Sequence, residues 1–217
     1  MTAPAAAARR DYMRSADRRS QIVDVTIELM AERGLAEVSI RDVATAAGVP
    51  FSSITYHFGT REELLRAVME SMIEKFCERM VAAAADSRPE DVLESYLAEI
   101  SSGTGYGPGH HMLLLEFTLY AARRPDTGLA RRQYESYEEA GSRVIDSLCA
   151  QTRTSFQGDR APVVRLLVAL LEGATLQQLA AGEPEGARPL LEHLGEVIGP
   201  HLVPTASDPP NQKGDGA

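Results

Sequence analysis

Residues 39–66 read SIRDVATAAGVPFSSITYHFGTREELLR, and this stretch decides the fold of the chain. Ser39 and Asp42 have the spacing of a capping box, which predicts a helix that begins directly after the serine. Gly48 is expected to end that helix, because glycine adopts a left-handed conformation without a Cβ penalty. Pro50 suits the first turn of a second helix, where a missing N–H costs nothing. The stretch therefore predicts two short helices that meet at a tight corner.

The second helix has an apolar side and a polar side. Ile54 and Phe58 are four residues apart and are expected to face inward. The polar and flat side chains that remain suit phosphates and base edges; they are Ser52, Ser53, Thr55, Tyr56 and His57. Thr60 and Glu63 then start a further helix by a second capping pattern. This arrangement is typical of a helix-turn-helix, although an ordinary αα corner with a solvated polar face has the same spacing.

From Asp17 to about Phe76 the sequence resembles the amino-terminal domain of the TetR family of transcriptional regulators. The segments that carry the resemblance are IVDVTIELMAERG, SIRDVATAAGV, ITYHF and GTREELLRAV. Many members have a tyrosine at the position of Thr55 and a serine or threonine at that of Pro50, and Phe51 stands where a polar residue is common. The resemblance, together with the polar face, predicts contacts with double-stranded operator DNA from Ser39, Arg41, Phe51, Ser52, Ser53, Thr55, Tyr56, His57 and Arg61.

The net charge of −9 is distributed unevenly. Residues 1–66 hold nine arginines and nine acidic residues, so the whole excess of acid lies in residues 67–217. The part of the chain that contains the predicted DNA-binding segment therefore has no net negative charge. Five arginines fall within the first nineteen residues. We expect residues 1–15 to form a flexible basic arm that follows DNA phosphates, with a merely solvated tail as the alternative.

Apolar runs in the chain are interrupted by charge well before the roughly 20 residues that a membrane span needs. The order of charge and alanine at the amino terminus is also the reverse of a signal peptide, so we expect a cytoplasmic protein without a membrane partner. In that compartment Cys77 and Cys149 are expected to be reduced thiols rather than a redox pair.

The remainder of the chain predicts further helices and no strand, so the fold class is all-α. We expect a three-helix DNA-binding domain over residues 16–60, a helical ligand-binding and dimerisation domain over 61–203, and a disordered tail over 204–217. A long helix from Thr60 to about Ala85 would connect the two domains. The last two helices, expected near 162–181 and 187–199, carry more apolar surface than one small bundle can bury.

Pairing of that surface with a second copy predicts a homodimer with a two-fold axis. The LLEGATLQQL segment also resembles the dimerisation helix of the family. The predicted interface residues are Leu166, Leu170, Gly173, Leu176, Gln177, Leu191 and Leu194. The alternative for each of them is the core of the protomer itself.

The resemblance also implies an effector pocket within the second domain. Aromatic and apolar side chains on its helices suggest a small, largely apolar ligand, and the predicted lining is His111, Leu114, Phe117, Tyr120 and Tyr137. The alternative is that these residues are simply core. We predict a ligand-released repressor with no cofactor, metal or catalytic site. A helical enzyme, metal-dependent or not, and an activator without a ligand are the alternatives.

Overall fold

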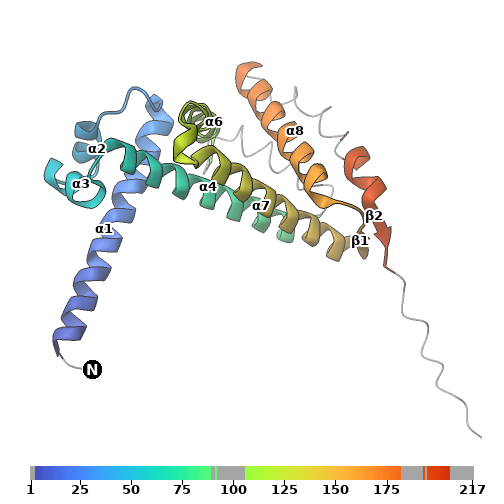
Figure 1. Cartoon of the computed structure of the whole chain (residues 1–217), viewed down its shortest axis with the longest axis horizontal. Helices are drawn as coiled ribbons and strands as arrows, with labels where there is room; N and C mark the ends of the chain where they lie inside the picture. Colours follow the sequence, from blue (N-terminus) through green and yellow to red (C-terminus); the bar gives the residue numbers. More distant parts are fainter. Residues whose placement is uncertain (1–2, 89–90, 92–105, 182–192, 194, 206–217) are drawn as a thin grey trace, which may run out of the picture.

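The computed structural model describes residues 3–88, 91, 106–181, 193 and 195–205, with the backbone alone for residues 3–14. Its amino-terminal unit consists of α1 (Ala3–Arg33), α2 (Ile40–Ala46) and α3 (Phe51–Phe58). The helix α4 (Arg61–Asp86) then leads from this unit along the length of the molecule (Figure 1). The predicted all-α fold with an amino-terminal helix-turn-helix is confirmed.

The corner between α2 and α3 forms as its sequence predicts. The Ser39 hydroxyl accepts a hydrogen bond from the backbone N–H of Asp42, and the Asp42 carboxylate accepts one from the backbone N–H of Ser39. Gly48 has a φ of 63°, in the left-handed region. Pro50 occupies the N-cap position of α3 rather than its first turn.

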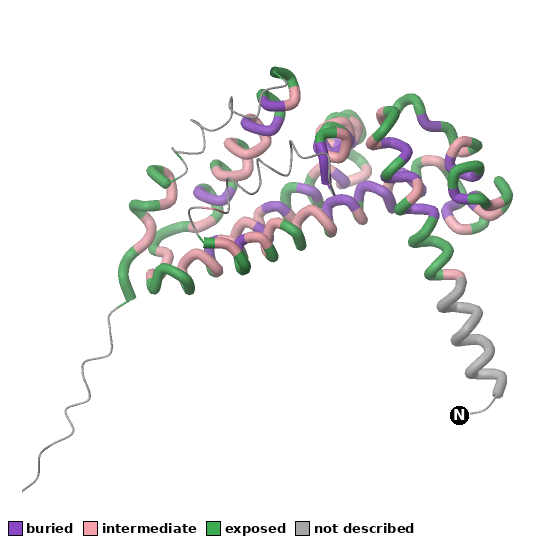
Figure 2. Tube along the Cα trace, turned by 180° about the vertical axis from the view of Figure 1, so that it is seen from behind, coloured by how far each residue is buried: buried purple, intermediate pink, exposed green. Residues whose placement is uncertain are grey.

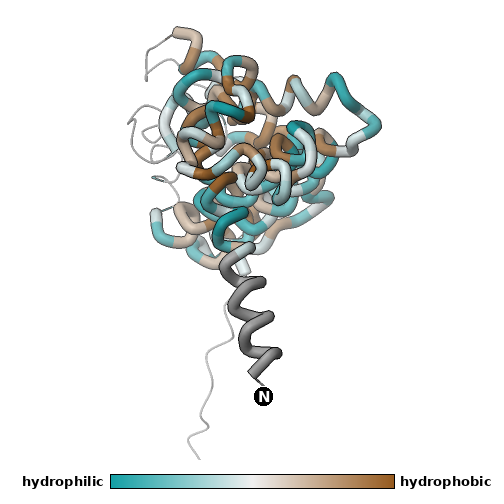
Figure 3. The backbone as a smooth tube through the Cα atoms, turned by 90° about the vertical axis from the view of Figure 1, so that its left-hand side faces the viewer, coloured by the Kyte–Doolittle hydropathy of each residue, from teal (hydrophilic) through white to brown (hydrophobic). Residues whose placement is uncertain are grey.

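In the second unit, α4 packs against α6 (Pro108–Ala122) and α7 (Leu129–Thr152), and α8 (Arg160–Ala181) packs against α7 and α6. Short 3₁₀ helices, η1 (Pro125–Thr127) and η3 (Gly199–His201), stand at the corners. Hydrophobic and hydrophilic residues alternate along the helices (Figure 3), as expected where each helix buries one side.

Three features differ from the sequence prediction. The first helix begins at Ala3, within the residues 1–15 that were predicted to form a flexible arm, because alanine and arginine are among the best helix formers and Pro4 falls in the first turn. Two short strands, β1 (Thr154–Phe156) and β2 (Leu202–Pro204), pair antiparallel where no strand was predicted. The helix expected near 187–199 and most of the expected tail lie largely outside the described residues.

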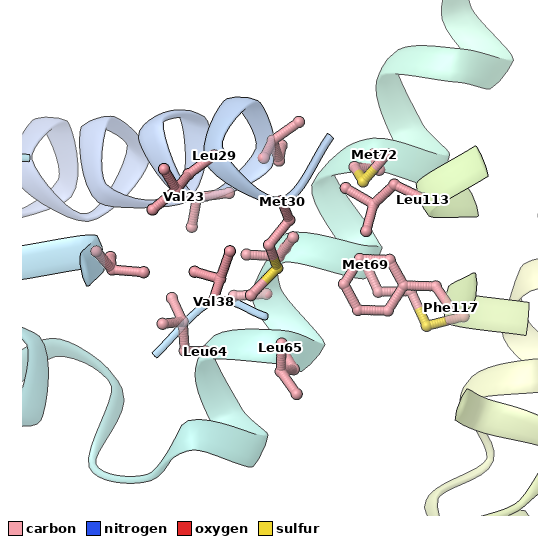
Figure 4. Close-up of a cluster of buried hydrophobic side chains, with 14 of the residues drawn as sticks. Val23, Leu29, Met30, Val38, Leu64, Leu65, Met69, Met72, Leu113 and Phe117 are labelled. Carbon is pink, nitrogen blue, oxygen red and sulfur yellow. The ribbon is translucent and has the colours of Figure 1, made fainter. Parts of the chain in front are cut away.

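One hydrophobic core runs through both units. Figure 4 shows Met30 of α1, Met69 and Met72 of α4, and Leu113 and Phe117 of α6 in a single cluster. Burial of each such side chain contributes about 1.5–3 kcal/mol, so the helix-turn-helix is packed firmly onto α4 and α6. Buried residues follow α4, whereas α8 is mostly exposed or intermediate along its length (Figure 2).

Candidate DNA-binding face and ligand pocket

The helix α3 has a solvent-exposed face on the side away from the core. Ile54 and Phe58 are 1% and 6% exposed, and they fix the orientation of α3 against the rest of the unit. Tyr56 is 81% exposed and Phe51 is 54% exposed. Exposure of two large aromatic rings to water on so short a helix is unfavourable. It therefore favours a face that binds a partner over an ordinary αα corner with a solvated face.

The predicted DNA-binding residues divide into two groups by exposure. Ser39, Arg41, Phe51, Ser52, Thr55 and Tyr56 are exposed, whereas Ser53, His57 and Arg61 are half-buried. The exposed members come from the start of α2 and from α3, and these two helices lie together at one end of the molecule (Figure 1).

Arg61 has a structural role that its sequence position did not indicate. Its Nη2 donates hydrogen bonds to the carbonyl oxygens of Leu35 and Val38, at 3.2 and 3.4 Å. These carbonyls belong to the loop between α1 and α2, so Arg61 fastens that loop to the beginning of α4. Only part of its guanidinium remains available to a phosphate.

A cavity of about 140 Å³ lies between α4, α6, α7 and α8. Three of the predicted ligand-binding residues line it: His111, Leu114 and Tyr137. Phe117 lies instead in the core, at 1% exposure, and Tyr120 lies beneath the Arg124 guanidinium, which is 3.8 Å from its ring centre. The sequence prediction missed Thr118 on α6 and several lining residues on α4 and α8; the latter include Phe76, Cys77, Glu172 and Thr175.

The polar groups at this cavity are few. Gln133 Nε2 donates to Thr118 Oγ1 at 2.8 Å and to Tyr137 Oη at 3.0 Å. The Tyr134 hydroxyl donates to the Glu172 carboxylate at 3.2 Å. Burial raises the pKa of the Cys77 thiol to about 11, so this cysteine is an unreactive apolar group at neutral pH.

His111 is 3% exposed, and burial lowers its pKa to about 4, with His110 adding to the effect. In the unfolded chain this histidine binds a proton as the pH falls below about 6.5, whereas in the folded chain it does so only near pH 4. The free energy of unfolding must fall as the pH drops through this window, by about 2 kcal/mol between pH 7 and pH 5.

Urea unfolding of the His111→Gln variant at both pH values is expected to show no such loss of stability. The exposed His193 gives a control: its glutamine variant should keep the full pH dependence, and an unaltered slope in His111→Gln would contradict the assignment.

The helix α6 connects the cavity with the DNA-binding unit. Its residues His111, Leu114 and Thr118 line the cavity. On its opposite side, the Glu116 carboxylate accepts a hydrogen bond from the backbone N–H of Leu35 at 2.7 Å. His110 Nε2 lies 3.2 Å from the Glu28 carboxylate of α1.

The predicted dimer face lies on α8. Leu166 and Leu176 are 47% and 53% exposed, Gln177 is exposed, and Leu170 and Gly173 are half-buried. Leu191 and Leu194 lie outside the described residues. Of the helices that the structure describes, α8 alone is long and apolar enough to cross a membrane, by length and composition only, with 28% of its apolar window buried. An apolar helix of this kind is equally what a subunit interface requires.

Among the described residues, no group of three or more histidine, cysteine, aspartate or glutamate side chains is arranged to hold a metal ion.

Comparison with known proteins shows matches to one family over most of the chain. Residues 22–68 match the family described as bacterial regulatory proteins, tetR family, and residues 87–197 match the tetracyclin repressor-like C-terminal domain. The transcriptional repressor KstR2 of Rhodococcus jostii (strain RHA1) is 39% identical over 75 residues, which are 33% of this chain and 36% of KstR2. The nicotine-responsive transcriptional repressor HdnoR of Paenarthrobacter nicotinovorans is 24% identical over 170 residues, which are 76% of this chain and 84% of HdnoR.

Among solved structures, the multidrug binding protein EbrR complexed with ethidium superposes with a TM-score of 0.60 at 30% identity, over 83% of this chain and 98% of EbrR. The two family matches together take in both the helix-turn-helix and the domain that contains the cavity. Proteins of this kind are generally transcription factors rather than enzymes. The chain belongs to the TetR family of DNA-binding transcriptional regulators.

Proposed function

We propose that this protein is a repressor that acts as a cytoplasmic homodimer on a palindromic operator and leaves the DNA when a small organic molecule fills the cavity. The two α3 helices of the dimer would enter successive major grooves, about 34–36 Å apart. The exposed residues of α2 and α3 would make the DNA contacts. The domain boundaries follow the same division: DNA binding up to about residue 60, ligand binding and dimerisation beyond it.

The observation that carries this proposal is the position of α6. One side of the helix lines the cavity, the opposite side holds the Glu116 contact to Leu35, and His110 at the start of the helix contacts Glu28 of α1. A ligand that displaces α6 therefore also moves the last turn of α1 and the loop before α2. Couplings of this kind are typically about 1–3 kcal/mol, which changes DNA affinity 5- to 150-fold.

The relatives support an organic effector. HdnoR is described as nicotine-responsive, and EbrR was solved with ethidium. The test begins with operator DNA selected from a random pool by the purified protein. A compound that binds the cavity should lower affinity for the selected duplex at least fivefold in fluorescence anisotropy. Failure to select any duplex, even at low salt, would reject the proposal.

The dimer is tested at Leu176, which is 53% exposed on α8. Leu176→Glu places a charge in the proposed apolar interface, twice per dimer, and we expect the dimer dissociation constant to rise about 30-fold, or ~2 kcal/mol. Sedimentation equilibrium measures this constant. Leu119 on α6 is 64% exposed, so Leu119→Glu makes the same change outside the proposed interface and should leave the dimer unaffected. Equal dimer dissociation constants for the two variants would contradict an interface on α8.

A further inference from the structure

The cavity between α4, α6, α7 and α8 has an asymmetric distribution of charge. Its walls are mostly aliphatic and aromatic, and Glu172 is the only acidic residue among the described residues that line it. The same described lining contains no lysine or arginine. Within the part of the chain that the structure describes, the cavity thus has one negative group and no side chain with a fixed positive charge to oppose it.

Among the described residues, a neutral group holds the Glu172 carboxylate in place and no cation pairs with it. The Tyr134 hydroxyl lies 3.2 and 3.3 Å from its two oxygen atoms. This neutral hydroxyl is the one donor to Glu172 from the described side chains, and it leaves most of the lone-pair positions of the carboxylate open. Burial raises the pKa of Glu172, which means that the charged form is poorly solvated where it stands. A cation in the cavity would offset that cost.

Aromatic rings form the wall on the α4 and α7 side. The rings of Phe76 and Tyr137 both line the cavity, with centres 5.6 Å apart in an edge-to-face arrangement. Tyr134 packs edge-on against Tyr137, with ring centres 6.0 Å apart, and so joins this wall to Glu172. Ring faces attract cations, so the carboxylate and the aromatic wall favour the same ligand charge.

We propose that the cavity binds an organic cation, in which a protonated or quaternary amine is joined to an apolar group of about one aromatic ring, with Glu172 as the counter-charge. The size follows from the volume of about 140 Å³, because an engineered cavity of about 150 Å³ accepts one benzene molecule. The inference rests on the proposed function in taking this cavity as the effector site. It replaces the largely apolar ligand that the sequence suggested with an amphiphilic cation.

The test compares two probes of nearly equal size, 2-phenylethylammonium and 2-phenylethanol, by calorimetric titration of the full chain without DNA at pH 7. We expect the ammonium to bind at least about tenfold more tightly, since a hydrogen bond to a charged group is worth about 1.5–3 kcal/mol. Equal affinities, or no binding of either probe, would overturn the inference on the wild-type protein alone.

Variants then assign the charge. Glu172→Gln keeps an acceptor for Tyr134 and should reduce the preference for the ammonium to less than about twofold. Glu138 provides the control, because it is a carboxylate on α7 that pairs with Arg165 at 2.7 Å and is absent from the lining. Glu138→Gln makes the same change in net charge and should keep the full preference. An undiminished preference in Glu172→Gln would overturn the role of Glu172.

The outcome is separable from the test of the proposed function, because binding is measured without DNA. An ammonium probe that binds as expected but leaves operator affinity unchanged supports the cation site and contradicts the effector role. Protein that binds its operator but neither probe contradicts the cation site alone.

Discussion

Replacing Thr55 with glutamate is expected to reduce affinity for the selected operator at least about 100-fold, or ~3 kcal/mol. Thr55 is exposed on α3, and its hydroxyl makes only a 3.5 Å contact with the carbonyl oxygen of Phe51. Bound in a major groove, a glutamate at this position would face the phosphate charges of both strands. Like charges brought together at an interface cost several kcal/mol, and a dimer incurs that cost twice.

The chain offers a closely matched control for this substitution. Thr152 is also an exposed threonine near the carboxyl end of a helix, and its hydroxyl also donates to the carbonyl oxygen four residues earlier, that of Leu148. Thr152→Glu therefore makes the same change in net charge and removes the corresponding hydrogen bond, together with a 2.8 Å hydrogen bond to Thr154 Oγ1, but on α7, far along the chain from the helix-turn-helix. Fluorescence anisotropy on one selected duplex should separate the two variants. If both bind like the wild type, α3 does not enter the groove.

Features of the fold that depend on neighbours in the sequence were predictable. The capping pair Ser39 and Asp42, the left-handed Gly48, and the burial of Ile54 and Phe58 all follow from spacings of three or four residues. Each is a local consequence of helix geometry, and the alternatives open to the chain at these positions are few. The start of α1 was less predictable, because propensity alone extends a helix that no capping residue delimits.

The site depends instead on contacts between distant segments. Arg61 reaches carbonyl groups that are 26 and 23 residues away, and Glu172 joins the cavity from a helix that its apolar pattern marks for dimerisation. Phe117 lies on the same helix as Leu114 and has the same apolar character, yet it points into the core. One sequence gives the period of a helix, whereas the direction of each face depends on the packing of four helices together.

The close crossing of α6 over α1 could not be predicted from the sequence. A Cβ atom built at Gly109 would overlap the carbonyl oxygen of Ala31, and a backbone atom has no rotamer by which to move away. Gly109→Val is therefore expected to lower the free energy of unfolding by about 3 kcal/mol, at the upper end of what overpacking costs. Urea unfolding measures this loss.

Ala122, exposed in the last turn of α6, gives the matched control for a valine on the same helix. Ala122→Val meets no neighbouring backbone and should cost only a few tenths of a kcal/mol through the lower helix propensity of valine. If Gly109→Val is as stable as Ala122→Val, then α6 and α1 are not in the contact described.

The smaller Gly109→Ala should still fold but push α6 away from α1. It would then weaken the coupling between cavity and operator while leaving ligand affinity in place, because the residues that line the cavity lie on the opposite side of α6.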